Sequence, residues 1–131
     1  MERTYGTQTG CPVAATLDII GDRWTLLILR DLVRGKSGKF KDLLESLHGI
    51  SPNLLANRLK RLENEGIVER SFYSDHPPRA EYRLAAKGQE LRPVVRAIAE
   101  WGYRHQLTDE QRASWPPPWG DAEKSLVAET N

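Results

Sequence analysis

The stretch from Ser51 to Gly66, SPNLLANRLKRLENEG, carries the side chains best suited to recognising a polar partner. Its leucines, Leu55, Leu59 and Leu62, recur at helical spacing and would form one narrow buried face. The opposite face would carry carboxamides and cations, with one more arginine on the flank: Asn53, Asn57, Lys60 and Arg61, with Arg58 beside the buried face. Carboxamides suit base edges and cations suit phosphates. These residues predict a helix that binds nucleic acid, although an ordinary solvated helix carries the same residue types.

Local signals mark the two ends of this helix. Ser51 is a good N-cap because its hydroxyl can accept a hydrogen bond from an unpaired amide of the first turn. Pro52 suits the first helical position, where a missing amide hydrogen costs no hydrogen bond. Gly66 can adopt the left-handed conformation that ends a helix. A helix between Ser51 and Gly66 is therefore predicted.

Three helices are expected before this one, and they must hold it in place. The apolar patterns predict a helix over 11–21, an almost wholly apolar and buried helix over 24–33, and a third over 41–47. A polar turn over 34–39 precedes the third helix, with Phe40 turned inward, and a glycine-containing turn at 48–50 follows it. A short helix, a tight turn and a second helix with a polar outer face are typical of the helix-turn-helix motif.

After Gly66 the hydrophobic period changes from helical to alternating, which predicts a β-hairpin. The strands are expected over 67–73 and 80–84, and the turn between them, SDHPPR, contains prolines that cannot donate to a strand ladder. This hairpin would form a wing beside the helix pair, with Arg79 at its base. Arg70 is expected to pair with Glu69 or Glu81 rather than with a nucleic acid.

A long helix is predicted from Ala85 to His105, with a weak start at Gly88 and a bend at Pro93. Its apolar side is wider than a small domain can cover. We therefore expect this helix and the first one to pack on a second copy of the chain, with packing inside one chain as the alternative. Residues 106–131 form an acidic tail, whose WPPPW stretch favours polyproline II. The tail would either dock its tryptophans or remain a disordered end.

Composition narrows the class of protein. The 131 residues carry a net charge of only +1, with a mildly basic body and the acidic tail. The one cysteine excludes an intrachain disulfide and favours the cytoplasm, and we find no signal peptide and no membrane-spanning run. The three histidines are far apart and show no metal-ligand spacing, and no nucleophile motif or phosphate-binding loop is present. We therefore expect no enzyme, no metal and no cofactor.

Several motifs together resemble the HxlR-type family of transcriptional regulators, a branch of the winged helix-turn-helix proteins related to MarR-type regulators. They are CPVAATLDIIGDRWTLLILRDL, GKF, GISPNLLANRLKRLENEGIVER, PPRAEYRL and AEWG, which cover about Cys11 to Gly102. The resemblance implies a mainly α fold with a small β-hairpin. It also implies a homodimer, built by the first and last helices, on a roughly palindromic double-stranded DNA operator. The expected parts are a flexible arm at 1–10, the DNA-binding and dimerisation domain at 11–105, and the tail at 106–131.

The candidate DNA-binding residues fall into three groups. Asn53 and Asn57 are expected at base edges, and Lys60 at a base or a phosphate. Arg79 of the wing is expected in the minor groove or at its phosphates, with His76 as a weaker candidate. The phosphate candidates are the start of the Ser51–Gly66 helix and the nearby cations: Ser51, Pro52, Lys36, Lys39, Lys41, Arg58 and Arg61.

Two effector hypotheses remain open. Cys11 stands at a predicted helix start, where the helix dipole can stabilise a thiolate, and some HxlR-type regulators act as thiol switches for electrophiles or oxidants. A buried structural cysteine is the commoner alternative. A small ligand could instead lie at a dimer interface lined by Trp24, Trp101 and Tyr103, where plain packing is the alternative.

The alternative to a DNA-binding regulator is a winged-helix module for protein contacts that has lost DNA binding.

Overall fold

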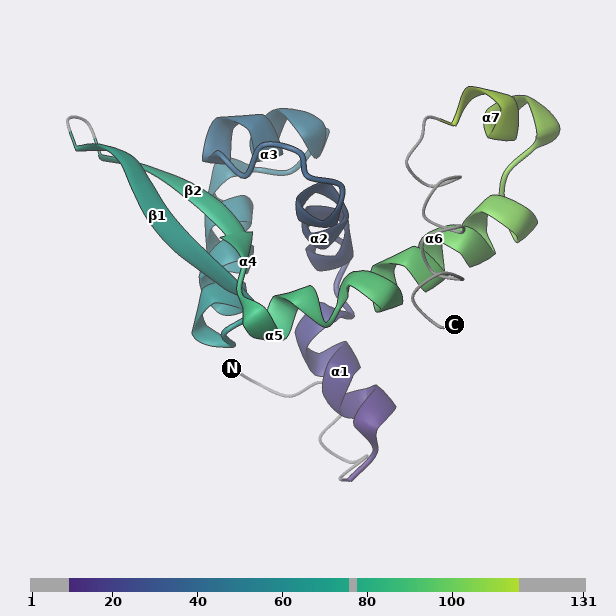
Figure 1. Ribbon diagram of the computed structural model, residues 1–131, viewed down its shortest axis with the longest axis horizontal. Helices are drawn as coiled ribbons and strands as arrows, with labels where there is room; N and C mark the ends of the chain where they lie inside the picture. The colour runs from purple at the N-terminus through teal and green to yellow at the C-terminus, as the bar shows by residue number, and fades with distance from the viewer. Residues whose placement is uncertain (1–9, 76–77, 116–131) are drawn as a thin grey trace. The chain divides into compact units, whose positions relative to one another are not determined.

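The computed structural model (Figure 1) describes residues 10–75 and 78–115. The chain divides into two compact units, with the boundary between Gly88 and Gln89. Residues 1–9 of the predicted arm at 1–10, His76 and the predicted tail after Trp115 lie outside the described residues. The first unit contains most of the secondary structure: α1 (Pro12–Ile20), α2 (Thr25–Val33), α3 (Phe40–Ser46), α4 (Pro52–Asn64), β1 (Val68–Asp75), β2 (Pro78–Leu84) and α5 (Ala86–Gln89). The second unit contains α6 (Arg92–His105) and α7 (Asp109–Ser114).

The core of the first unit forms around α2, as its apolar sequence predicts. Ile28 and Leu29 are completely buried. The other helices and the base of the hairpin also contribute buried apolar side chains: Leu43 and Leu47 around α3, Leu55, Leu59 and Leu62 of α4, and Val68 and Leu84 of the strands. Burying α4 through its leucines leaves its opposite side uncovered, which is the arrangement that the sequence predicted.

The ends of α4 follow the predicted local signals. The Ser51 hydroxyl oxygen accepts a hydrogen bond from the Leu54 amide at 3.1 Å, and Pro52 is the first helical residue. Gly66 has a φ of 75° and closes the other end. There the Ile67 amide donates to the Leu62 carbonyl and the Gly66 amide to the Glu63 carbonyl, at 2.9 and 3.0 Å. This pair of bonds is the Schellman arrangement, so the chain leaves α4 in a fixed direction toward β1.

The hairpin is longer than predicted. β1 and β2 pair antiparallel from Val68 and Leu84 outward, and the register shifts between Phe72 and Ser74 (Figure 1). The expected six-residue turn at 74–79 is wrong, because Ser74 pairs with Arg79 and Asp75 with Pro78. A proline is tolerated at that position because it is the first residue of β2.

Main-chain atoms attach β2 to the turn between α2 and α3. The Tyr82 amide donates to the Gly38 carbonyl at 2.8 Å, and Lys39 forms an isolated bridge with Glu81. A Cβ atom at position 38 would lie 1.8 Å from the Tyr82 carbonyl oxygen. Only glycine therefore allows this close approach. Phe40, which follows the bridge at Lys39, already begins α3.

The predicted continuous helix over 85–105 is wrong. It is interrupted between Gln89 and Arg92, which separates α5 from α6. Pro93 lies in the first turn of α6, where its missing amide hydrogen is tolerated, whereas a helix continuing through it would lose a hydrogen bond. The predicted bend is thus a complete break.

The helix α7 was not predicted. Its N-terminus forms a capping box, in which the Thr108 side chain accepts from the Gln111 amide and the Gln111 side chain accepts from the Thr108 amide. Within the same unit, Arg112 donates to the main-chain carbonyls of Tyr103 and Arg104 at 2.8 and 2.9 Å. The first part of the predicted tail is therefore helical and attached to the end of α6.

Candidate nucleic-acid interface

The outer face of α4 exposes Asn53, Asn57 and Lys60 together, as predicted. Ser51 and Pro52 are also exposed at the start of the helix. Because the leucines on the other side are buried, these polar groups are held at fixed positions on a rigid helix. This face can offer amide donors and acceptors, one ammonium group and the partly positive helix N-terminus to a nucleic acid.

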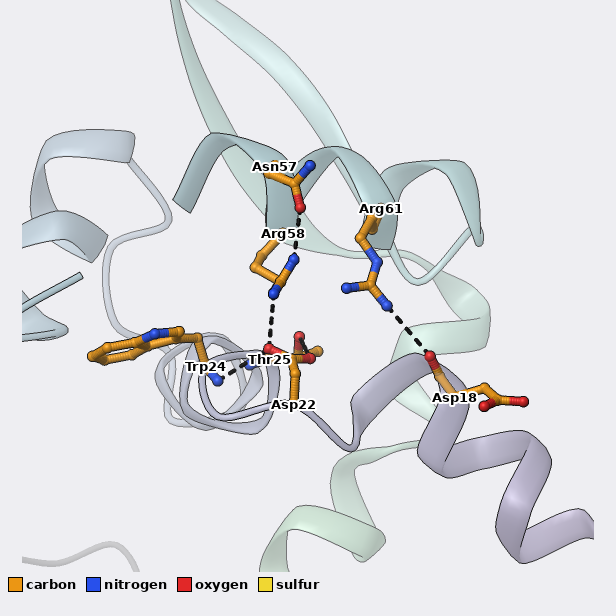
Figure 2. A network of polar contacts seen from close by, with 7 residues as sticks. All are labelled: Asp18, Asp22, Trp24, Thr25, Asn57, Arg58 and Arg61. Atoms are coloured by element: carbon orange, nitrogen blue, oxygen red, sulfur yellow. Dashed lines mark hydrogen bonds and ion pairs between the residues drawn. The ribbon is translucent and has the colours of Figure 1, made fainter. Parts of the chain in front are cut away.

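Arg58 lies on the flank of α4, as predicted, but its guanidinium has partners within the chain (Figure 2). Its Nε donates to the Asp22 carboxylate at 2.9 Å, and its Nη1 donates to Oδ1 of Asn57 at 2.7 Å. The side chains of Arg58 and Asp22 are each only 21% exposed. The positive charge proposed for a phosphate is thus already paired with a carboxylate between α1 and α2.

Asp22 is the residue that sequence reasoning missed at this site. Its carboxylate accepts from the amides of Trp24 and Thr25 at 3.1 and 3.2 Å, and also from the Thr25 hydroxyl. Burial raises the pKa of Asp22. The opposite effect is larger, because the carboxylate accepts hydrogen bonds from Thr25, Trp24 and Arg58 and lies beside the Arg58 charge. The pKa of Asp22 is therefore lower than its ordinary value. The sequence does contain a signal for this role, because an aspartate just before a predicted helix can cap its first turn.

The prediction that Arg61 points outward with the carboxamides is wrong. Arg61 follows Arg58 by three residues, so the two arginines share one flank of the helix. Arg61 is half-buried, and its Nη2 donates to the main-chain carbonyl of Asp18 at 3.3 Å (Figure 2). Asp18 lies in the last turn of α1, where carbonyls have no partner inside their own helix. Arg61 therefore joins α4 to the end of α1.

The other predicted cations lie in the first unit but outside α4. Lys36 and Lys41 are exposed, whereas Lys39 is half-buried with its ammonium 4.8 Å from the centre of the Tyr73 ring. Arg79 is exposed and is the second residue of β2, where it pairs with Ser74 near the tip of the hairpin, so the prediction that it lies at the base of the wing is wrong. Lys41 and Arg79 share a groove between the start of α3 and the hairpin with the aromatic rings of Phe40, Phe72, Tyr73 and Tyr82.

Arg70 pairs with Glu63 of α4, Nε to Oε2 at 3.5 Å, which corrects the expected pairing with Glu69 or Glu81. Glu69 instead accepts from Arg83 at 2.8 Å, because the two residues are opposite each other in the hairpin. The ion pair between Arg70 and Glu63 thus connects the wing to α4.

Cys11 is the N-cap of α1 and is half-buried, with its Sγ accepting from the Ala14 amide at 3.5 Å. Among the proposed effector-site residues, Trp24 is nearly buried and is covered by the Arg23 guanidinium, 4.8 Å from its ring centre. Trp101 and Tyr103 are exposed on α6 of the second unit.

Within residues 10–75 and 78–115, no cluster of three or more His, Cys, Asp or Glu side chains is placed to hold a metal ion. None of the helices in that part of the chain has the length and apolar character needed to cross a membrane.

Comparisons with known proteins agree with this architecture. Residues 19–110 match the model of the HxlR-like helix-turn-helix family. The HTH-type transcriptional regulator sll1512 of Synechocystis is 39% identical over 92 residues, which cover 70% of this chain and 67% of that protein. The regulator YybR of Bacillus subtilis is 37% identical over 98 residues, 75% of this chain and 78% of the relative.

Solved structures give the same result. The putative transcription factor PA1607 has a TM-score of 0.71 at 36% identity, over 87% of this chain and 83% of that one. The redox regulator HypR in its oxidised form has a TM-score of 0.68 at 33% identity, over 75% of this chain and all of the other. The relatives are transcriptional regulators, a class without enzymatic activity. The chain, mainly helical with a winged hairpin, belongs to the HxlR-like helix-turn-helix family of transcriptional regulators, a family that implies DNA binding.

Proposed function

We propose that this chain is a sequence-specific regulator that binds a roughly palindromic operator in double-stranded DNA as a homodimer. The observation that carries this proposal is the exposed face of α4, where Asn53, Asn57 and Lys60 project from a helix anchored by buried leucines. A helix of this kind fits the major groove, whose base edges present distinct patterns of donors and acceptors.

The cations divide into two roles in this proposal. Lys41, Lys60 and Arg79 are exposed and contact phosphates, with Lys39 and Lys36 beside them. Arg58 and Arg61 hold α4 in position, because their guanidiniums bond to Asp22, Asn57 and the Asp18 carbonyl. Removing a phosphate contact weakens binding to all sequences and reduces its salt dependence, whereas removing a base contact reduces discrimination.

Exposed apolar side chains support a homodimer. On α1, Val13 is 66% exposed, and on α6 Ile98 and Trp101 are 48% and 59% exposed. Burying such side chains against a second copy removes apolar surface from water, and twofold dimers are the commonest oligomers. In a dimer on DNA, the two α4 helices would be about 34–36 Å apart, one turn of the duplex.

Selection of bound duplexes from a random pool tests the proposal directly, followed by gel-shift titration on selected and scrambled sites. Lys41→Ala should weaken binding to both sites by a similar factor, and Asn53→Ala should lower the ratio between them. Arg83→Ala is the matched control, because it removes an exposed charge that is already paired with Glu69. A pool that yields no enriched sequence would favour a protein-contact module without DNA binding.

For effector response we propose modification of Cys11 by an electrophile or oxidant. Support comes from the similarity to the redox regulator HypR and from the position of Cys11 as the half-buried N-cap of α1. The products proposed for this cysteine are a disulfide to Cys11 of the partner subunit and an adduct with a small thiol or electrophile. An effector bound near Trp24, Trp101 and Tyr103 has less support, because Trp24 is nearly buried. Loss of operator release by an electrophile in Cys11→Ser would support the thiol response.

A further inference from the structure

We infer that Asn57 presents its NH2 donor to DNA rather than its acceptor, because Arg58 binds the carbonyl oxygen and directs it toward the guanidinium. Asn57 would therefore select a base edge that accepts hydrogen bonds, and it would not make the two-bond contact with adenine that asparagine commonly makes. This inference rests on the proposed function of α4 as the helix that reads the major groove.

The chemistry of the Arg58 contact determines which way the Asn57 amide faces. A guanidinium carries donors and no acceptor, so the Asn57 atom that it contacts must be the oxygen. The contact joins Nη1 of Arg58 to Oδ1 of Asn57 at 2.7 Å. Figure 2 shows the Asn57 nitrogen on the opposite side of the amide, directed away from Arg58. Because Asn57 is exposed, this NH2 group is the part available to a base.

Arg58 is itself held in place, so it cannot easily release the Asn57 oxygen. Its Nε bonds to Asp22 at 2.9 Å, and both side chains are largely covered. Asp22 is fixed in turn by Trp24 and Thr25 at the start of α2, and Thr25 is only 2% exposed. The orientation of one carboxamide on α4 is thus determined by the beginning of the buried central helix.

Asn53 provides an internal contrast one turn earlier on the same face. It is exposed, and its side chain makes no hydrogen bond with the part of the chain that the structure describes. Its amide can turn either way and can present a donor and an acceptor together. Adenine offers both N7 as an acceptor and the N6 amino group as a donor, so Asn53 suits adenine. Guanine offers two acceptors, N7 and O6, and thymine offers O4, so these bases suit Asn57.

The test uses the wild-type chain first. A random pool gives the selected operator, and the position where Asn57→Ala loses its base preference is the position that Asn57 reads. We expect guanine or thymine there in the wild type. For a guanine, replacement by 7-deazaguanine, which lacks the N7 acceptor, should weaken binding roughly 2- to 10-fold, the range of one hydrogen bond. Adenine at this position, with binding weakened when its amino group is removed, would overturn the inference.

Two variants change the outward group in opposite directions. Arg58→Met removes the donors while keeping the length, so Asn57 regains its acceptor and adenine should appear at its position. Asn57→Asp keeps the Arg58 contact and directs an acceptor outward, so the preference should move to cytosine, whose N4 amino group donates. The second variant does not depend on whether Arg58→Met folds, and an unchanged base preference in Asn57→Asp would contradict the inference. A pool without any enriched duplex overturns the proposed function as well, whereas enrichment of an adenine whose amino group is needed for binding at the Asn57 position overturns this inference alone.

Discussion

Replacing Asp22 with alanine removes four interactions with the start of α2 and with Arg58. Losing a capping acceptor costs about 1 kcal/mol. Losing a largely covered ion pair adds about 1 kcal/mol. We therefore expect Asp22→Ala to lower the free energy of unfolding by about 2 kcal/mol at neutral pH, which corresponds to a fall in Tm of roughly 8 °C for a domain of this size.

The pH dependence gives this prediction its specific signature. The pKa of Asp22 in the folded protein lies below 3.8, its ordinary value, so the ionised carboxylate stabilises the fold. That stabilisation is complete above the unfolded pKa and is lost as the pH falls through the folded pKa. The difference in stability between the wild type and Asp22→Ala should therefore be largest near neutral pH and should shrink as the pH falls below 3.8, the ordinary pKa of the group.

Urea unfolding followed by circular dichroism at several pH values measures both the loss of unfolding free energy in Asp22→Ala and its dependence on pH. Glu45→Ala is the matched control, because Glu45 is an exposed carboxylate of α3, and we expect a change of less than about 0.5 kcal/mol. A stability difference for Asp22→Ala that stayed constant from neutral to acidic pH would refute the reasoning, since the effect would then not come from the charge.

Three further predictions concern the fold and the proposed dimer. Ser51→Ala should lower the free energy of unfolding by about 1 kcal/mol in urea titrations. Ser51→Asp should retain most of the stability that the Ser51 cap supplies, because aspartate also caps helices. Gly38→Ala should cost about 3 kcal/mol or prevent folding, since its Cβ would overlap the Tyr82 carbonyl; a normal thermal melt would show that the turn adjusts freely. Trp101→Glu should convert a dimer to a monomer in sedimentation velocity runs while leaving the helical circular dichroism unchanged. A dimer of unchanged affinity would exclude α6 from the interface.

The features that local chemistry determines could be predicted from the sequence. Ser51, Pro52 and Gly66 act on the few residues next to them, so the limits of α4 followed from propensity and capping alone. The leucines of α4 are buried for the same reason, since their spacing allows only one covered face. The capping box at Thr108 and Gln111 was an equally local signal, and α7 could have been predicted from it.

Contacts between distant segments could not be predicted in the same way. Arg58 and Asp22 are 36 positions apart, and Arg61 and Asp18 are 43 apart, so their pairing depends on how α1, α2 and α4 pack. A helical wheel places a side chain by angle only and does not show whether another helix covers that flank. The division of the α4 cations into exposed and covered groups therefore required the three-dimensional structure.

The attachment of β2 at Gly38 affects which positions in the hairpin are free to change. The bond from the Tyr82 amide to the Gly38 carbonyl uses backbone atoms that every residue except proline provides at position 82. Side chains on the hairpin can therefore vary among related regulators without changing where the hairpin is rooted. Substitutions of side chains on the hairpin are therefore compatible with its attachment, whereas a Cβ atom at position 38 is not.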